Sequence, residues 1–204
     1  ARTHRSRRIN HFNVVASHFV LPEYKEVSHT FEAGNHFDEQ QKKIMASIWE
    51  DLRNAYKFGS LIRVEEKLDA MMPRNTLDLF SQSDMQKAFD FRNSFITNLR
   101  NQVENLTGER NNRFTRFKTN NAITFLDVIS QKYDVAVANP PYTASADFGP
   151  DLKEFIEANY RKPLKFNTNL YASFIKRCCE LTREDGKVGM IHPLTFMYII
   201  TFED

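Results

Sequence analysis

Glycine and cysteine are both scarce in this sequence. Six of the 204 residues are glycine, about 3%, against a usual share of about 7%. The two cysteines, Cys178 and Cys179, are adjacent, so an ordinary disulfide between them is geometrically implausible, and they offer no metal-ligand spacing. The sequence therefore predicts neither a disulfide framework nor a metal centre, and it fits a reducing compartment.

Long hydrophobic runs and a strong net charge are also missing. The longest apolar run, residues 189–202, contains His192 and Pro193 and falls short of the roughly 20 residues of a membrane-spanning helix. No apolar segment follows the four arginines of residues 1–8, so we expect no signal peptide. The formal charge of +2 is too small for the whole molecule to bind nucleic acid electrostatically. We expect a cytoplasmic protein without a membrane segment.

The chain is predicted to begin with a basic segment followed by helices. Residues 1–35 form a basic connector or arm, with arginine clustered near its start, and a foreign tag or a nucleic-acid arm are alternative interpretations. Residues 36–118 form a helical region. Apolar spacing predicts one helix over 36–58, ended by Gly59, and a second over 83–108. We expect these two helices to pair in antiparallel fashion.

Arginine and phenylalanine alternate at the end of this helical region, within residues 109–118. Arg110, Arg113 and Arg116 are spaced by three, with phenylalanines between them. Arginine beside aromatic rings can hold phosphates and stack on bases, which makes these three residues candidate DNA contacts. The alternative is a solvated face whose phenylalanines point inward.

The remainder, residues 119–204, has an α/β pattern. Residues 134–138 are predicted to form a buried strand of the parallel type, 167–181 a helix, 184–186 a turn and 187–192 a second strand. This order is a βαβ unit, which pairs its strands in parallel. In open α/β sheets, ligands bind at the carboxyl ends of the strands.

The tetrapeptide Asn139-Pro140-Pro141-Tyr142 stands at such an end. Two prolines fix two φ angles and remove two backbone donors, so the loop is rigid and presents acceptors: the Asn139 side-chain oxygen and the Pro140 carbonyl. Paired acceptors suit the two hydrogens of an exocyclic amine, and Tyr142 can stack on the ring that carries it. Such acceptors also stabilise the positive charge that develops when a conjugated amine attacks an electrophile.

These residues carry a family resemblance. The segment DVAVANPPY, residues 134–142, resembles motif IV of S-adenosylmethionine-dependent amino-methyltransferases, particularly N6-adenine DNA enzymes. From Phe125 onward the chain resembles the PglX-type adenine methyltransferase of BREX phage-defence systems. The resemblance implies an α/β fold, part of a Rossmann-like methyltransferase sheet preceded by helices. It also implies S-adenosyl-L-methionine as cofactor, double-stranded DNA and other BREX components as partners, and a bacterial cytoplasm.

Site residues follow from the resemblance position by position. Asn139 and Pro140 would bind the target amine, Pro141 would shape the loop, and Tyr142 would stack on a flipped adenine. Phe125 lies where related enzymes have an aromatic residue on the cofactor's adenine, although Thr124 replaces the acidic residue often found before it. His192 and Phe196 are further candidates for the wall of the site, and structural roles are their alternative.

The glycine shortage bears directly on this assignment. Related enzymes hold the methionine end of the cofactor with a glycine-rich turn after a strand, and the six glycines here form no Gly-x-Gly at such a place. We therefore expect residues 119–204 to be the C-terminal half of a catalytic domain that lacks motif I, and the chain to be inactive alone. The same motif IV serves glutamine and RNA N2-guanine methyltransferases, and a non-catalytic DNA- or partner-binding fragment is a third alternative.

Overall fold

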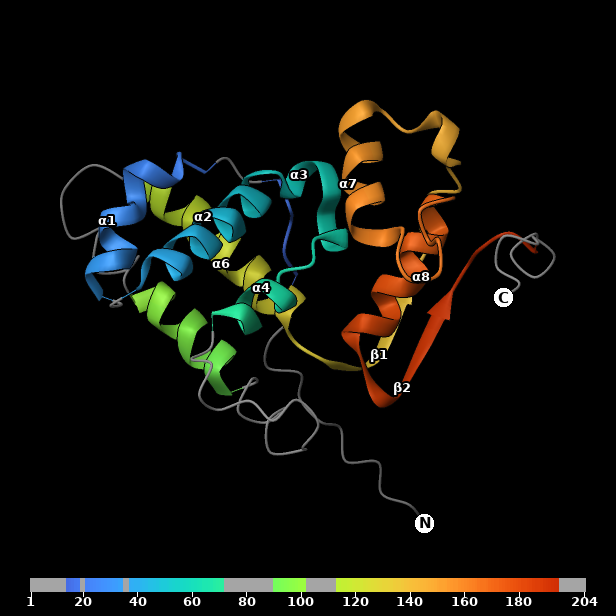
Figure 1. Ribbon diagram of the computed structural model, residues 1–204. Helices are drawn as coiled ribbons and strands as arrows, with labels where there is room; N and C mark the ends of the chain where they lie inside the picture. The colour runs from blue at the N-terminus through green and yellow to red at the C-terminus, as the bar shows by residue number, and fades with distance from the viewer. Residues whose placement is uncertain (1–13, 19–20, 35–36, 72–89, 102–112, 195–204) are drawn as a thin grey trace, which may run out of the picture.

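The computed structural model describes the chain except residues 1–13, 19–20, 35–36, 72–89, 102–112 and 195–204. Its N-terminal helices are α1 (Tyr24–Gly34), α2 (Glu39–Arg53), α3 (Ala55–Phe58) and α4 (Glu65–Ala70), with a 3-10 turn η1 (Gly59–Leu61) before α4. Residues 90–101 are helical, and α6 spans Arg113–Ser130. There follow β1 (Tyr133–Ala138), η3 (Ser145–Asp147), α7 (Pro150–Tyr160), α8 (Leu170–Leu181) and β2 (Thr182–Met190) (Figure 1).

Helix α2 begins at a capping box. The Gln41 backbone N–H donates to the Asp38 carboxylate at 2.7 Å, and the Asp38 N–H donates to the Gln41 side chain at 3.0 Å. In place of the single helix predicted over 36–58, the described residues form α2 from Glu39 and α3, separated at Asn54. Gly59 ends α3 with a φ of +52°, as predicted. A positive φ at this place favours glycine, because other residues reach it only with strain.

One hydrophobic core joins the helices of the N-terminal region. It contains Trp49 of α2, Leu99 of the 90–101 helix and Leu126 of α6, all at most 2% exposed. The predicted helices over 36–58 and 83–108 thus share a core, although residues 83–89 and 102–108 lie outside the described part. The expected boundary between residues 118 and 119 falls inside α6, and the second half of that helix packs into this same core.

A second core lies under the α/β part of the chain. It is formed by one residue of η1, one that follows η3, two of α7 and one of α8: Leu61, Phe148, Ile156, Tyr160 and Leu170. Phe155 packs against both cores, and its ring stacks on that of Phe58 with centroids 4.0 Å apart. The two cores therefore meet along α3 and α7.

The two strands form the parallel pair that the βαβ pattern predicts. Val135 to Ala138 of β1 pair in order with Lys187 to Met190 of β2. The expected turn at 184–186 is instead a bulge inside β2, because Tyr133 pairs with Thr182 and Val135 already pairs with Lys187. A side chain at Gly186 would lie 2.9 Å from the Asp134 carbonyl oxygen, which explains the glycine at this crowded place. The helix predicted over 167–181 is observed as α8, which begins at Leu170 instead of residue 167 and packs against both strands.

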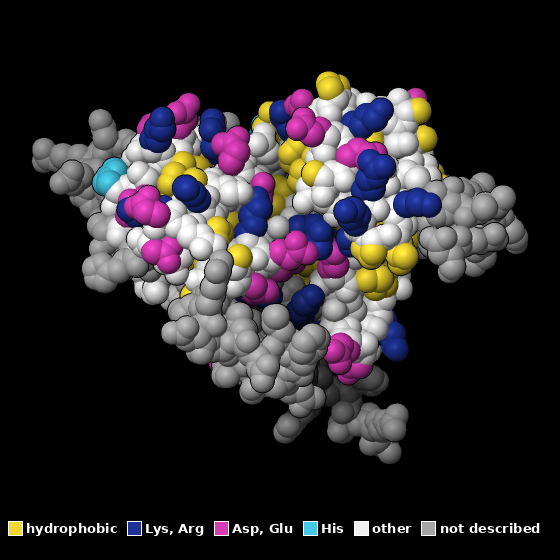
Figure 2. Space-filling model, in the orientation of Figure 1, with side chains coloured by type: hydrophobic (Ala, Val, Ile, Leu, Met, Phe, Trp, Pro, Cys, Tyr) yellow, Lys and Arg dark blue, Asp and Glu magenta, His cyan; other side chains and the backbone are white. Residues whose placement is uncertain are grey.

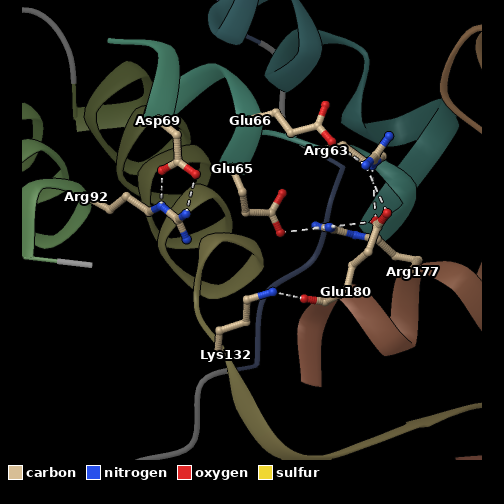
Figure 3. A pocket seen from close by; sticks show the side chains of 8 residues that line it. All are labelled: Arg63, Glu65, Glu66, Asp69, Arg92, Lys132, Arg177 and Glu180. Carbon is tan, nitrogen blue, oxygen red and sulfur yellow. Dashed lines mark hydrogen bonds and ion pairs between the residues drawn. The ribbon is translucent and has the colours of Figure 1, made fainter. Parts of the chain in front are cut away.

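Charged side chains connect the helical region to α8 (Figure 3). Arg177 of α8 is 1% exposed. Its guanidinium donates to the carbonyl oxygens of Ser60 at 2.7 Å and Ile129 at 3.1 Å, and to the Glu65 carboxylate at 2.7 Å. Arg63 pairs with Glu180 of α8 at 2.9 Å. All of these contacts join residues far apart in the sequence, so they fix α8 against the helices.

We predict that replacing Arg177 by alanine lowers the free energy of unfolding by about 3–5 kcal/mol, because the substitution leaves Glu65 and the carbonyl groups of Ser60 and Ile129 without their donor. Urea unfolding measures this difference. The matched control is Arg183→Ala, which removes a 2.7 Å ion pair with Asp134 whose arginine side chain is 57% exposed, and which should cost less than about 1 kcal/mol. Equal effects of the two substitutions would contradict the role given to Arg177.

Candidate target-base site

The tetrapeptide of residues 139–142 follows β1 directly, at the carboxyl end of the strand pair. Pro140 is buried, whereas Asn139 and Pro141 are exposed and Tyr142 is 52% exposed. A buried proline between exposed neighbours anchors the loop and leaves the Asn139 amide and the Tyr142 ring facing solvent. The side chains of Asn139 and Tyr142 are therefore accessible to a ligand, and their roles as acceptor and stacking ring stay predictions.

Backbone hydrogen bonds hold this loop on both sides. The Ile191 N–H, just after β2, donates to the Ala138 carbonyl at 3.2 Å. On the other side, the Leu170 N–H donates to the Thr143 carbonyl at 2.9 Å, and the Ser145 N–H donates to the Thr168 carbonyl at 3.0 Å. These bonds include one antiparallel bridge between Ala144 and Asn169. The loop is therefore tied to β2 and to the segment that opens α8.

The segment before α8 is itself fixed. The buried Ser173 hydroxyl donates to the Phe166 carbonyl at 2.8 Å, and the Asn167 side chain donates to the Glu157 carboxylate at 2.6 Å. The sequence analysis assigns residues 167–169 to the helix and gives them no supporting role. Asn169 could have marked the true helix start, because asparagine is favoured at helix N-caps and this residue directly precedes the apolar run of α8.

An aromatic pair stands at the same edge of the sheet. His192 follows β2, and its ring lies over that of buried Tyr171, at the start of α8, with centroids 6.2 Å apart and planes 16° apart. The His192 Nδ1 atom lies 3.0 Å from the Pro193 carbonyl oxygen. The structure thus places His192 beside the predicted site, packed on a core aromatic residue. Phe196 lies outside the described residues.

The other predicted site residues are distributed over α6 and the segment before it. Phe125 is 5% exposed and packs in the core of the helical region, and the Thr124 hydroxyl donates to the Asn120 carbonyl at 2.8 Å. A cofactor contact from Phe125 stays a prediction from the resemblance. Arg113 and Arg116 belong to α6, but their side chains, and Arg110 altogether, lie outside the described part of the chain.

Charges of both signs are mixed over the helical surface seen in Figure 2.

In the described residues, no group of three or more His, Cys, Asp or Glu side chains has the arrangement of a metal site. None of the helices found there is long and apolar enough to cross a membrane. The exposed side chains of the loop at the carboxyl edge of the sheet include the Asn139 amide and the Tyr142 phenol.

Comparison with known proteins now defines the class. The Eco57I restriction-modification methylase family matches residues 6–204, and the chain belongs to that family. Among curated proteins, it is 29% identical over 76 residues to the adenine-specific methyltransferase BrxX of Escherichia coli O9:H4 (strain HS), and 28% identical over 88 residues to the adenine-specific methyltransferase PglX of Lacticaseibacillus casei (strain Zhang). These alignments include 37% and 43% of this chain but 6% and 7% of the two relatives. The resemblance expected from the motif is confirmed.

We predict that the exposed members of the site contribute little to stability. Asn139→Ala and Tyr142→Ala should each change the free energy of unfolding by less than about 0.5 kcal/mol, since both side chains face solvent. Ser173→Ala should cost about 1–3 kcal/mol, because it leaves the Phe166 carbonyl without its donor. Urea unfolding of the three variants checks the contrast, and a large loss on Asn139→Ala would show that its amide is part of the packing.

Proposed function

We propose that this chain provides the target-base loop of a site-specific DNA adenine N6-methyltransferase of a BREX phage-defence system. The observation that carries the proposal is the rigid loop at the end of β1, with buried Pro140 and exposed Asn139 and Tyr142. Membership of a restriction-modification methylase family and similarity to two adenine-specific methyltransferases support the same reaction.

The proposed roles follow from the chemistry of the amine. An adenine in duplex DNA must leave the stack before its N6 can reach this loop. The Asn139 side-chain oxygen and the Pro140 carbonyl accept the two N6 hydrogens, and the Tyr142 ring stacks on the base. Accepting both hydrogens favours a pyramidal nitrogen, so its lone pair becomes available for attack, and it stabilises the charge that develops on the nitrogen.

The described residues do not fit the methionine end of S-adenosylmethionine, the methyl donor that the family implies. Its electrophilic methyl group would be supplied to the amine when the cofactor is bound. Among the described glycines, Gly34 ends α1, Gly59 follows α3, Gly149 precedes α7, and Gly186 and Gly189 lie inside β2. None of these provides the Gly-x-Gly turn after a strand that close backbone approach to the cofactor requires. We therefore assign binding of the target amine to the loop of this chain, and binding of the cofactor's methionine end to other parts of the longer protein.

We predict that Asn139→Ala lowers the rate of N6-adenine methylation by the complete gene product at least about 100-fold, as loss of one preorganised hydrogen-bonding group does at other charged transition states. Radiolabelled methyl transfer to unmethylated DNA measures the rate. The matched control is Asn98→Ala on the exposed surface of the 90–101 helix, which should leave the rate unchanged. Undiminished methylation by the Asn139 variant would refute the proposal.

We further predict that the 204-residue chain alone does not bind S-adenosylmethionine with micromolar affinity and does not methylate DNA. The physical reason is the missing glycine turn. Titration calorimetry with the cofactor provides the measurement, and a micromolar dissociation constant would show that the described residues suffice for binding.

A further inference from the structure

The connection between α7 and α8 begins with three exposed cations, Arg161, Lys162 and Lys165. We call residues 161–165 the basic loop. The sequence from residue 158 to residue 179 contains no aspartate or glutamate. Figure 2 shows several Lys and Arg side chains close together over the part of the surface that α7 and α8 form. Because the whole chain has a formal charge of only +2, the basic loop is a local concentration of positive charge.

The cations of the basic loop are accessible to an anionic ligand. Among the described residues, no carboxylate lies within ion-pair distance of Lys162 or Lys165. Arg161 lies 3.4 Å from the Glu157 carboxylate, but its side chain is 69% exposed. A guanidinium has five N–H donors, so Arg161 can serve a second acceptor while it keeps Glu157. All three side chains therefore have donors that face water.

Hydrogen bonds fix the backbone of the basic loop, although its side chains are exposed. The Lys165 N–H donates to the Arg161 carbonyl at 2.8 Å, and the Lys176 ammonium of α8 donates to the Lys162 carbonyl at 3.0 Å. Lys165 has a φ of +54°, a conformation that residues other than glycine adopt uncommonly. A fixed backbone that presents charged side chains loses less conformational entropy when it binds a ligand than a mobile one does.

The basic loop adjoins the loop that carries Asn139. The Thr168 carbonyl, three residues beyond Lys165, accepts the hydrogen bond from the Ser145 N–H, and Asn169 forms the bridge with Ala144. Three residues of extended chain span at most about 11 Å, so the Lys165 backbone lies within that distance of Thr168. One DNA strand carries a phosphate about every 3.4 Å along the helix axis, so a base held at Asn139 brings several phosphates to this part of the surface.

We propose that the basic loop binds phosphates of the DNA strand beside the flipped adenine, through Lys162 and Lys165 and with Arg161 as a further donor. Such contacts hold the strand in position and carry no sequence information, so they are independent of the sequence around the adenine. An acidic protein segment could also bind lysines, but the position beside the target-base loop favours DNA. The proposal rests on the proposed function, because it takes DNA as the ligand.

Binding of duplex DNA to the complete gene product, without cofactor, tests this proposal. Fluorescence anisotropy gives the binding constant between about 50 and 200 mM salt, for two duplexes of unrelated sequence. The test variant combines Lys162→Ala with Lys165→Ala. The matched control combines Lys25→Ala with Lys43→Ala, which removes two exposed lysines from α1 and α2 and changes the net charge equally. A third variant, Lys162→Arg with Lys165→Arg, keeps both charges.

We expect the test variant to bind both duplexes at least about ten-fold more weakly at 100 mM salt. Its plot of the logarithm of the binding constant against the logarithm of salt concentration should be less steep by about 2, because two phosphate contacts are lost. The control and the arginine variant should bind as the unchanged protein does. Unchanged affinity and slope in the test variant, or an equal loss in the control, would overturn the proposal, and so would a loss confined to one duplex sequence.

This assay separates the basic loop from the reaction. If the test variant loses affinity as expected but the unchanged protein leaves DNA adenine unmethylated in the presence of S-adenosylmethionine, the proposed function is wrong and the phosphate contact stands. If the unchanged protein methylates DNA adenine and the test variant binds DNA normally, the phosphate contact is wrong and the proposed function stands.

Discussion

The buried guanidinium of Arg177 is the interaction on which the arrangement of the whole structure depends. It belongs to α8, the helix that packs on both strands, and it is bonded to the backbone of Ser60 and Ile129 and to Glu65 in the helical region. The opening segment of the same helix holds the loop of residues 139–145 through the Thr168 and Leu170 backbone. One element therefore connects the helical region, the sheet and the loop of residues 139–145, so a shift of α8 would be transmitted to all three.

The described residues form a small sheet of two strands. Asn139 follows β1 directly, so it lies at the carboxyl edge of the two parallel strands. Helix α8 packs against both strands. Val135 and Val137 remain in water. The exposed valines of β1 and the lack of a Gly-x-Gly turn after a strand, both within the described residues, are the features that the proposed place of this chain in a longer methyltransferase accounts for.

Local chemistry explains which elements the sequence predicts well. The strand before Pro140, the helical spacing of α8 and the cap at Gly59 each depend on nearby residues, and each is confirmed. The predicted burial of that strand is wrong for the described structure, because Val135 and Val137 are 59% and 77% exposed. The parallel pairing follows from the βαβ order. Helix α7 is absent from the sequence prediction, although Pro150 at its first turn followed by Asp151 is a recognisable start signal.

Tertiary contacts explain what the sequence predicts poorly. The sequence predicts a turn where β2 has its bulge, because the segment Glu-Asp-Gly is compatible with a turn and with a bulge. Which of the two forms depends on how β2 pairs with β1, and this pairing is set by contacts between distant residues. The buried role of Arg177 could not be predicted, since its partners lie as many as 117 residues away. Asn139 and Tyr142 are exposed, as a site that binds a ligand there requires. Their proposed chemical roles come from the residue types of the motif.

The central claim is that the loop at the end of β1 presents a DNA adenine for methylation at N6. Nucleoside mass spectrometry tests it most directly. The complete gene product is incubated with S-adenosylmethionine and, in parallel, with unmethylated DNA, RNA and a glutamine-containing protein substrate. The account predicts N6-methyldeoxyadenosine in the DNA and no methylated guanine or glutamine in the other reactions. Methylation confined to RNA guanine or protein glutamine, with unmodified adenine in the DNA, would contradict it.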